Sequence, residues 1–124
     1  MNYLIIGGGI AGTTTAEELR KIDANATITI LSNEKHPLYS RVILPQYILG
    51  RVARERVFLK PENWYLDHKI ELVFDDVTGV YPNNKLVTTQ KDSYEYDKLL
   101  IAGGGVINHM DFPGHADILH FQTI

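Results

Sequence analysis

The feature that most constrains this chain is a run of glycines placed between a strand-like segment and a helix-like segment. Residues 2–6 (NYLII) form a short apolar strand, and residues 7–12 carry glycines in the spacing GxGxxG. Apolar residues then recur at helical spacing over residues 10–22, and residues 27–31 (TITIL) are β-branched and strand-like. The order strand, glycine turn, helix, strand predicts a βαβ unit with a right-handed crossover.

The glycine spacing is that of a dinucleotide-binding fingerprint. Gly7 permits a tight turn, Gly9 lets the backbone approach a pyrophosphate, and Gly12 lets the helix pack closely on the strand. Glu34 lies 22 residues after Gly12, where a carboxylate can accept hydrogen bonds from ribose hydroxyls. A structural glycine turn with a solvated glutamate stays open as the alternative. A P-loop is excluded because no Gly-Lys-Ser/Thr follows, whereas NAD and FAD fit the fingerprint equally.

The rest of the chain predicts a larger α/β domain. Its expected elements are a helical segment ending at Gly50, a basic connection over residues 51–56, a short helix with Pro61 in its first turn, a strand over 70–74, a three-stranded meander over 75–96, and a strand over 98–102 that again ends in glycines. We therefore predict the α/β fold class, as a Rossmann-like three-layer domain of parallel sheet, helices and three-stranded antiparallel β-meander.

Composition excludes several function classes. A chain of 124 residues makes one domain, and its net charge of −3 offers no basic field for a nucleic acid. No apolar run approaches the roughly 20 residues that span a bilayer, and the first residues show no basic segment followed by an apolar stretch and a cleavage site. We therefore expect no membrane partner and a cytoplasmic location. The chain has no cysteine, so redox chemistry would need a bound cofactor. Its 5 histidines are scattered without metal-site spacing, and no metal site is predicted.

The order of these motifs resembles the pyridine-nucleotide-disulfide oxidoreductase superfamily over essentially all 124 residues. The resemblance is closest to the branch of rubredoxin and ferredoxin reductases, NADH oxidases and the flavoprotein part of nitrite reductases. It implies that this segment binds FAD and that a second domain binds NAD(P)H. Hydride would pass from the nicotinamide to the flavin. Electrons would then reach a rubredoxin- or ferredoxin-like protein or a small-molecule acceptor.

The resemblance also implies a set of cofactor-binding residues. These are Gly7, Gly9, Ala11, Gly12, Glu34, Arg41, Val77, Ala102, Gly103 and Gly104. The residues of the first glycine turn would face the FAD pyrophosphate, and the last three would form a second close backbone approach. Glu34 would bind the adenosine ribose, Arg41 would lie along the flavin cofactor, and Val77 would read the adenine through its backbone.

The chain departs from the family pattern at several positions. Gly103 stands where a threonine is usual, and Ile107 stands where a proline is usual. The redox cysteine of the thiol-dependent branch falls on Val42, so thiol-based turnover is excluded. A lysine that lies near the flavin in ferredoxin reductases falls on Gln46, so no catalytic residue is assigned.

We expect residues 1–124 to be the N-terminal FAD-binding segment of a longer reductase, inactive alone because the NAD(P)H-binding domain is absent. Residues 115–124 resemble the stretch where the superfamily crosses between these domains. Two alternatives stay open, a regulatory NAD-binding module that gates ion transport and a non-catalytic, cofactor-free scaffold. The basic residues Arg51, Arg54, Arg56 and Lys60 are either a solvated face or a docking site for an acidic electron carrier. The oligomeric state and the choice of NADH or NADPH stay open.

Overall fold

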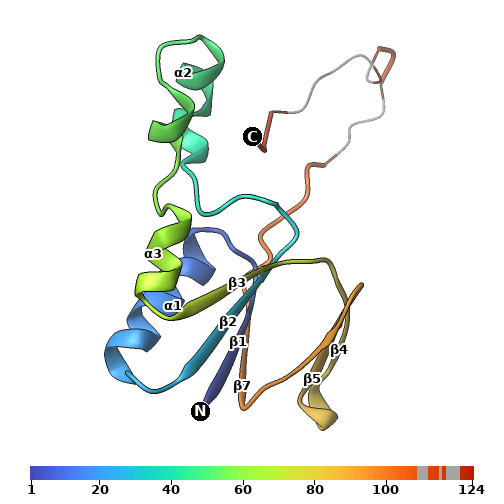
Figure 1. Ribbon diagram of the computed structural model, residues 1–124. Helices are drawn as coiled ribbons and strands as arrows, with labels where there is room; N and C mark the ends of the chain where they lie inside the picture. Colours follow the sequence, from blue (N-terminus) through green and yellow to red (C-terminus); the bar gives the residue numbers. More distant parts are fainter. Residues whose placement is uncertain (109–111, 115, 117–120) are drawn as a thin grey trace.

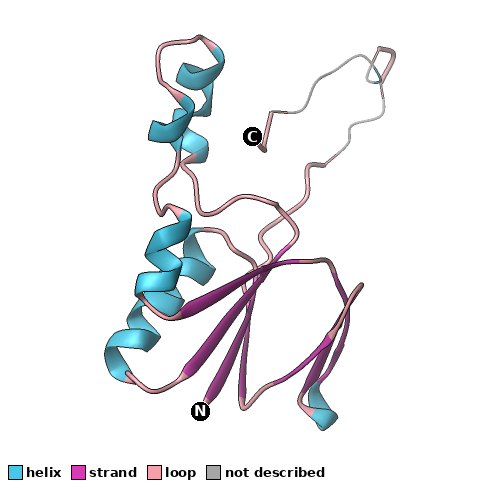
Figure 2. Ribbon diagram, in the orientation of Figure 1, coloured by secondary structure: helices cyan, strands magenta, loops and turns pink. Residues whose placement is uncertain are grey.

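The computed structural model describes residues 1–108, 112–114, 116 and 121–124. Figures 1 and 2 show a twisted parallel sheet with helices against one face and a smaller sheet against the other. The elements are β1 (Asn2–Ile6), α1 (Ile10–Ile22), β2 (Thr27–Ser32), η1 (Arg41–Ile43), α2 (Leu44–Ile48), η2 (Arg54–Val57), α3 (Glu62–Asp67), β3 (Ile70–Phe74), β4 (Val77–Tyr81), η3 (Pro82–Asn84), β5 (Leu86–Thr89), β6 (Ser93–Glu95) and β7 (Lys98–Ile101).

The main sheet has 4 strands in the order β3-β2-β1-β7, and every pairing is parallel. The first strand of the chain therefore lies in the middle of the sheet, between β2 and β7. Ile5 is opposite both Ile30 and Leu100. Parallel strands are normally covered on both faces, which explains why successive residues of β1 and β2 are buried, instead of every second one. The predicted three-layer α/β architecture is confirmed.

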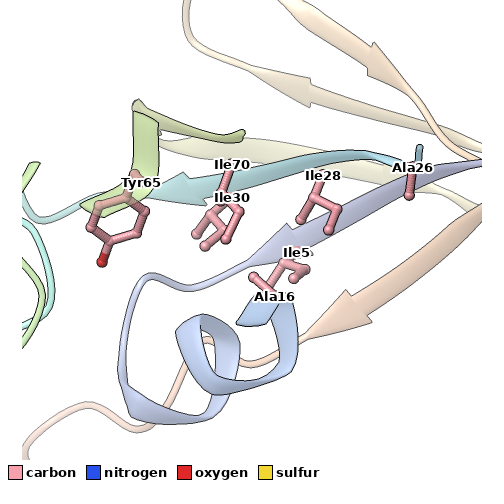
Figure 3. Close-up of a cluster of buried hydrophobic side chains, with 7 residues drawn as sticks. All are labelled: Ile5, Ala16, Ala26, Ile28, Ile30, Tyr65 and Ile70. Carbon is pink, nitrogen blue, oxygen red and sulfur yellow. The ribbon is translucent and has the colours of Figure 1, made fainter. Parts of the chain in front are cut away.

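Successive residues of the central strands face opposite layers. Ile5 and Ile30 are fully buried on the helical side, where they meet Ala16 of α1 and Tyr65 of α3 (Figure 3). Each such isoleucine contributes about 1.5 to 3 kcal/mol by leaving water. The neighbouring Leu31 faces the other layer, where it packs with residues of the small sheet. The helices and the small sheet therefore use alternate positions of the same strands.

The small sheet is the predicted antiparallel meander, in the order β4-β5-β6. The Asn83–Asn84 turn forms within η3 and is completed by Lys85 at a φ of +49°. The register shifts between Val77 and Gly79, which marks an irregularity at the start of β4. Val87 of β5 is fully buried against the parallel sheet.

A third cluster lies away from both sheets. Tyr39, Leu44 and Val57 are buried together between η1, α2 and η2, and Ile124 packs against them. Figure 1 shows α2 and residues 102–108 beyond the edge where β1, β2 and β3 end. We call this edge the carboxyl edge, because the carboxyl ends of all four parallel strands lie there.

Several local details differ from the sequence prediction. β7 ends at Ile101, one residue before the predicted end, and α2 ends at Ile48 instead of Gly50. β2 extends by one residue to Ser32, which is buried although polar. The basic connection contains a short 3₁₀ helix, η2. Pro61 caps α3 from the preceding position instead of lying in its first turn. Across the residues that the structure describes, no helix combines the length and apolar character needed to cross a membrane.

Candidate nucleotide-binding site

The residues predicted to bind the cofactor all come from segments at the carboxyl edge. The first glycine turn follows β1, Glu34 follows β2, Val77 begins the strand after β3, and Ala102 follows β7. Backbone hydrogen bonds join these segments: the Gly7 amide donates to the Leu31 carbonyl at 2.8 Å, and the Ala102 amide donates to the Ile6 carbonyl at 2.7 Å. Side-by-side strands in this order explain why residues far apart in sequence meet.

The first glycine turn has one packed side and one open side. Gly7 has a φ of +115°, and a Cβ added to it would lie 2.2 Å from the carbonyl oxygen of Ala102. A Cβ on Gly12 would lie 2.0 Å from the carbonyl oxygen of Gly7. In contrast, a Cβ on Gly9 would meet nothing within 4 Å. Gly7 and Gly12 therefore have the turn and packing roles predicted for them, and the ligand contact of Gly9 stays a prediction.

The open side of the turn is the amino end of α1. The first intrahelical bond is donated by the Thr13 amide to the Gly9 carbonyl at 3.0 Å. The amides of Ile10, Ala11 and Gly12 therefore have no acceptor within the helix. The first turn contains no acidic residue, and Gly9 caps the helix without a side chain. This end carries the positive pole of the helix dipole and suits an anionic group.

The second glycine turn is also open. A Cβ added to Gly103, Gly104 or Gly105 would meet nothing within 4 Å, and Gly104 has a φ of +69°. The backbone is therefore accessible to a ligand where the first turn and β7 meet. The absence of a threonine side chain at Gly103 leaves this turn without a hydroxyl that could hold a partner.

Glu34 does not extend freely into solvent. Its Oε2 accepts a hydrogen bond from the Tyr39 hydroxyl, and its Oε1 accepts one from the Arg41 guanidinium. Its backbone carbonyl accepts a bond from the Ser32 hydroxyl at 3.1 Å. Burial, the hydrogen bond to Glu34 and that carboxylate's charge raise the pKa of Tyr39 to about 12. Arg41, expected along the flavin, is thus paired with the predicted ribose acid in this structure.

Val77 follows a connection that is held at the end of β2. The Asp75 amide donates to the Ser32 carbonyl at 2.9 Å, which holds the β3–β4 connection against the end of β2. The Val77 side chain packs into the cluster between the two sheets, while its backbone is part of the β4–β5 pairing. Its predicted role in reading adenine stays a prediction.

Sequence reasoning missed three residues that shape the site. Thr13 is fully buried, and its hydroxyl donates to the Gly8 carbonyl at 3.2 Å, which fixes the first turn. Ser32 and Tyr39 hold the two ends of Glu34. A polar residue at the end of an apolar strand was the available signal for Ser32, whereas nothing local indicated where the Tyr39 hydroxyl would lie.

Other predicted features stand apart from this edge or outside the described residues. Val42, the position of the family's cysteine, is 91% exposed on η1, and Gln46 lies on α2. Within the described part of the chain, no group of three or more potential ligands could hold a metal ion. His109, His115 and His120 lie outside the described residues, as does half of the predicted domain-crossing stretch.

A parallel sheet of this order, with a glycine turn leading into a helix at its carboxyl edge, defines a Rossmann-like dinucleotide-binding domain. A sequence model described as pyridine nucleotide-disulphide oxidoreductase matches residues 1–124. The chain belongs to this family of oxidoreductases, as the resemblance predicted.

Relatives of known function match most of the chain. NADH-rubredoxin oxidoreductase of Clostridium acetobutylicum is 35% identical over 117 residues, covering 92% of this chain and 30% of that protein. The ferredoxin reductase subunit of 5,5'-dehydrodivanillate O-demethylase from Sphingobium sp. is 35% identical over 114 residues, covering 90% and 28%. The chain therefore spans less than a third of the length of these relatives.

Solved structures agree with the fold. The crystal structure of the clostridial NADH:rubredoxin oxidoreductase superposes with a TM-score of 0.77 at 29% identity, covering 90% of this chain and 30% of that one. A ferredoxin reductase from Rhodopseudomonas palustris superposes with a TM-score of 0.83 at 27% identity, covering 91% and 28%. The Rossmann-like reductase fold is thereby shown for this chain.

Proposed function

We propose that residues 1–124 form the FAD-binding segment of an NAD(P)H-dependent flavoprotein oxidoreductase that passes electrons onward without a redox disulfide. The observation that carries the proposal is the meeting of two open glycine turns at the carboxyl edge, with Glu34 at the end of the adjacent strand. The FAD-binding role is supported by the match to a family of flavin- and nicotinamide-dependent reductases.

The residues present fit an adenine dinucleotide. The amino end of α1 offers amides without an acceptor in the helix and a positive pole, and the open Cβ position of Gly9 leaves room for phosphate oxygens to approach the backbone. Glu34 is 26% exposed at its side chain, so its carboxylate can still accept hydroxyl donors. The second glycine turn presents further backbone without side chains in the way. These groups complement a pyrophosphate and a ribose.

Bound FAD would accept a hydride and release its electrons to an acceptor. The contribution of this chain is to bind and orient the cofactor: α1 stabilises the pyrophosphate charge, and Glu34 holds the ribose. Because the sequence has no cysteine, no thiol of this chain can take up the electrons. We place NAD(P)H binding outside residues 1–124, since the chain carries one complete GxGxxG fingerprint.

The acceptor proposed for such a reductase is an electron-carrier protein, because several relatives are named as rubredoxin or ferredoxin reductases. Arg51, Arg54 and Arg56 lie on and before η2, and none of them forms an ion pair among the described residues. Unpaired arginines on an exposed segment favour encounter with an acidic protein. If the carrier docks here, replacing all three with alanine should flatten the salt dependence of carrier binding. An unchanged salt dependence would exclude this docking surface.

Nucleotide titration of the purified protein tests the central claim. Isothermal calorimetry with FAD, FMN and NAD should give binding that is tightest for FAD, because FMN lacks the adenosine half of the ligand. Gly9→Val should abolish this binding while lowering the melting temperature only slightly, since its side chain would point into open space and only the helix cap is weakened. Ile22→Val, at a position 79% exposed on the same helix, is the matched control and should bind like the wild type.

The same titration separates the rival functions. Tighter binding of NAD than of FAD would favour a regulatory NAD module. Binding of no nucleotide by the wild type would favour the cofactor-free scaffold. Either outcome would overturn the FAD-binding proposal.

A further inference from the structure

We propose that Tyr39 is a positioning residue of the ribose subsite: its hydroxyl, together with Arg41, fixes the Glu34 carboxylate so that it meets the two ribose hydroxyls of the nucleotide in one orientation. This inference rests on the proposed function and deepens it, because it assigns a role to a side chain that need not touch the nucleotide. It also explains how the Glu34 carboxylate is oriented before the nucleotide binds.

The number of hydrogen bonds that the Glu34 carboxylate accepts supports this role. The Tyr39 hydroxyl donates to Oε2, and Arg41 donates to Oε1, so each carboxylate oxygen has one described donor. Each oxygen has two acceptor sites. One site therefore remains on each oxygen, and a ribose offers two hydroxyls. The cluster holds the carboxylate without using up its capacity to bind.

The two donors differ in how firmly they are held. Tyr39 is 7% exposed, and its backbone forms an antiparallel bridge with Phe58. On either side of it, the Ser40 amide donates to the Val57 carbonyl and the Leu59 amide to the Leu38 carbonyl, both at 2.8 Å. The Arg41 side chain is 47% exposed, and an ion pair in such a setting contributes little by itself. The position of the carboxylate is therefore set mainly by Tyr39.

Fixing the acid before the ligand arrives lowers the cost of binding. A glutamate side chain that moves freely before binding loses rotamer freedom when it binds, which lowers its affinity for the ligand. The partial exposure of Glu34 matters here, because it leaves the remaining acceptor sites of the carboxylate open to a ligand. The Glu34 carboxylate is thus held by the buried Tyr39 on one side and is accessible to a ligand on the other, as a preorganised binding group should be.

Binding of ADP and of 2′,3′-dideoxyadenosine 5′-diphosphate to the whole 124-residue chain tests this role. Both probes carry adenine and pyrophosphate, but the second lacks the hydroxyls that Glu34 would bind. The wild type should bind ADP more tightly than the dideoxy nucleotide. Tyr39→Phe should weaken ADP binding about tenfold, as expected for a lost hydrogen bond to a charged group. It should leave binding of the dideoxy nucleotide within about twofold.

Three further proteins complete the experiment. Tyr47→Phe removes a hydroxyl from the same hydrophobic cluster and should bind both probes like the wild type. Glu34→Gln should lose the preference for ADP, and adding Tyr39→Phe to it should cause no further loss, because the tyrosine acts through the carboxylate. The Glu34→Gln comparison keeps the test valid if Tyr39→Phe lowers the melting temperature.

The outcomes distinguish this inference from the proposed function. If Tyr39→Phe weakens both probes equally, or weakens neither, the positioning role is wrong while nucleotide binding stands. The same holds if the two substitutions are additive. If the wild type binds neither probe, the nucleotide site itself is refuted.

Discussion

The guanidinium of Arg20 donates a hydrogen bond to the backbone carbonyl of Lys69 at 2.7 Å, across 49 residues of sequence. The same side chain donates to the carbonyls of His68, Asp23 and Ala24 at 2.9 to 3.2 Å. One arginine therefore joins the end of α1 to the connection between α3 and β3, where Lys69 adopts a φ of +51°.

Arg20→Met should lower the free energy of unfolding by about 2 to 3 kcal/mol, because it leaves several carbonyls without their donor. Urea denaturation followed by circular dichroism measures this change. Lys21→Met is the matched control, since the ion pair between Lys21 and Glu18 is exposed and should contribute almost nothing. A similar loss of unfolding free energy for both variants would show that the hydrogen bonds of Arg20 to the backbone carbonyls do not stabilise the fold.

Gly12→Ala should destabilise the fold by about 2 to 4 kcal/mol, because its Cβ would overlap the backbone of the first glycine turn. Gly9→Ala should cost at most about 1 kcal/mol, as a weaker helix cap, and should act mainly on nucleotide affinity. Thermal unfolding and FAD titration of the pair separate packing from ligand access. Equal destabilisation by both changes would contradict this division.

The second glycine turn offers a complementary pair. Gly103→Ala should stabilise the protein by about 0.4 to 1 kcal/mol, because the site is open and the unfolded chain loses freedom. Gly104→Ala should destabilise it by about 1 kcal/mol, since its φ of +69° strains any residue with a Cβ. Guanidinium denaturation at neutral pH measures both. The prediction is wrong if the two substitutions have the same sign.

Tyr39 should make the protein sensitive to alkaline pH. Its pKa is raised from 10.0 to about 12, so the folded state keeps the phenol protonated where the unfolded state would not. The resulting stability is fully present below pH 10 and is lost as pH rises toward 12, an effect on the order of 2 kcal/mol. Unfolding free energies measured across this range should fall less steeply for Tyr39→Phe. Parallel curves would show that the phenol is not linked to folding.

Asp75 should have the opposite dependence, at acid pH. Burial opposes its charge, but hydrogen bonds from Thr89 and from the amides of Asp76 and Lys91 hold the pKa of its carboxyl below the usual value. Its contribution is therefore present above the ordinary aspartate pKa and is lost as pH falls through the lowered one. Asp75→Asn should be less stable than the wild type at pH 7, and the gap should close on acidification. A constant gap from pH 7 to pH 3 would contradict the linkage.

The elements that could be predicted are those whose cause is local. The GxGxxG spacing, the apolar strands and the turn residues of the meander each act over a few positions, so α1, β3 and the meander were predicted correctly. The extension of β2 to Ser32 was not predicted, because that serine is buried by contacts with Glu34 and Asp75, which lie beyond the strand.

The site shows the same division. Gly7 and Gly12 could be assigned from spacing alone, because each meets backbone of the first turn or of the adjacent strand end. The hydrogen bonding of the Glu34 carboxylate could not be predicted from the sequence, because it depends on Tyr39. The position of Tyr39 is set by its backbone pairing with Phe58. Contacts made through a separate hydrophobic cluster leave no periodic signal in the sequence.

The place of β1 between β2 and β7 governs when the site can exist during synthesis. The Asn2 amide bonds to the Asp97 carboxylate across 95 residues, so the first strand must wait for its second neighbour. At ribosomal speeds that wait lasts roughly 5 to 20 s, during which β1 has an open, apolar edge. The first glycine turn, proposed to bind phosphate, is synthesised early, but the second glycine turn follows only after β7. A nascent chain therefore cannot complete the proposed dinucleotide site until Gly104 has left the ribosome.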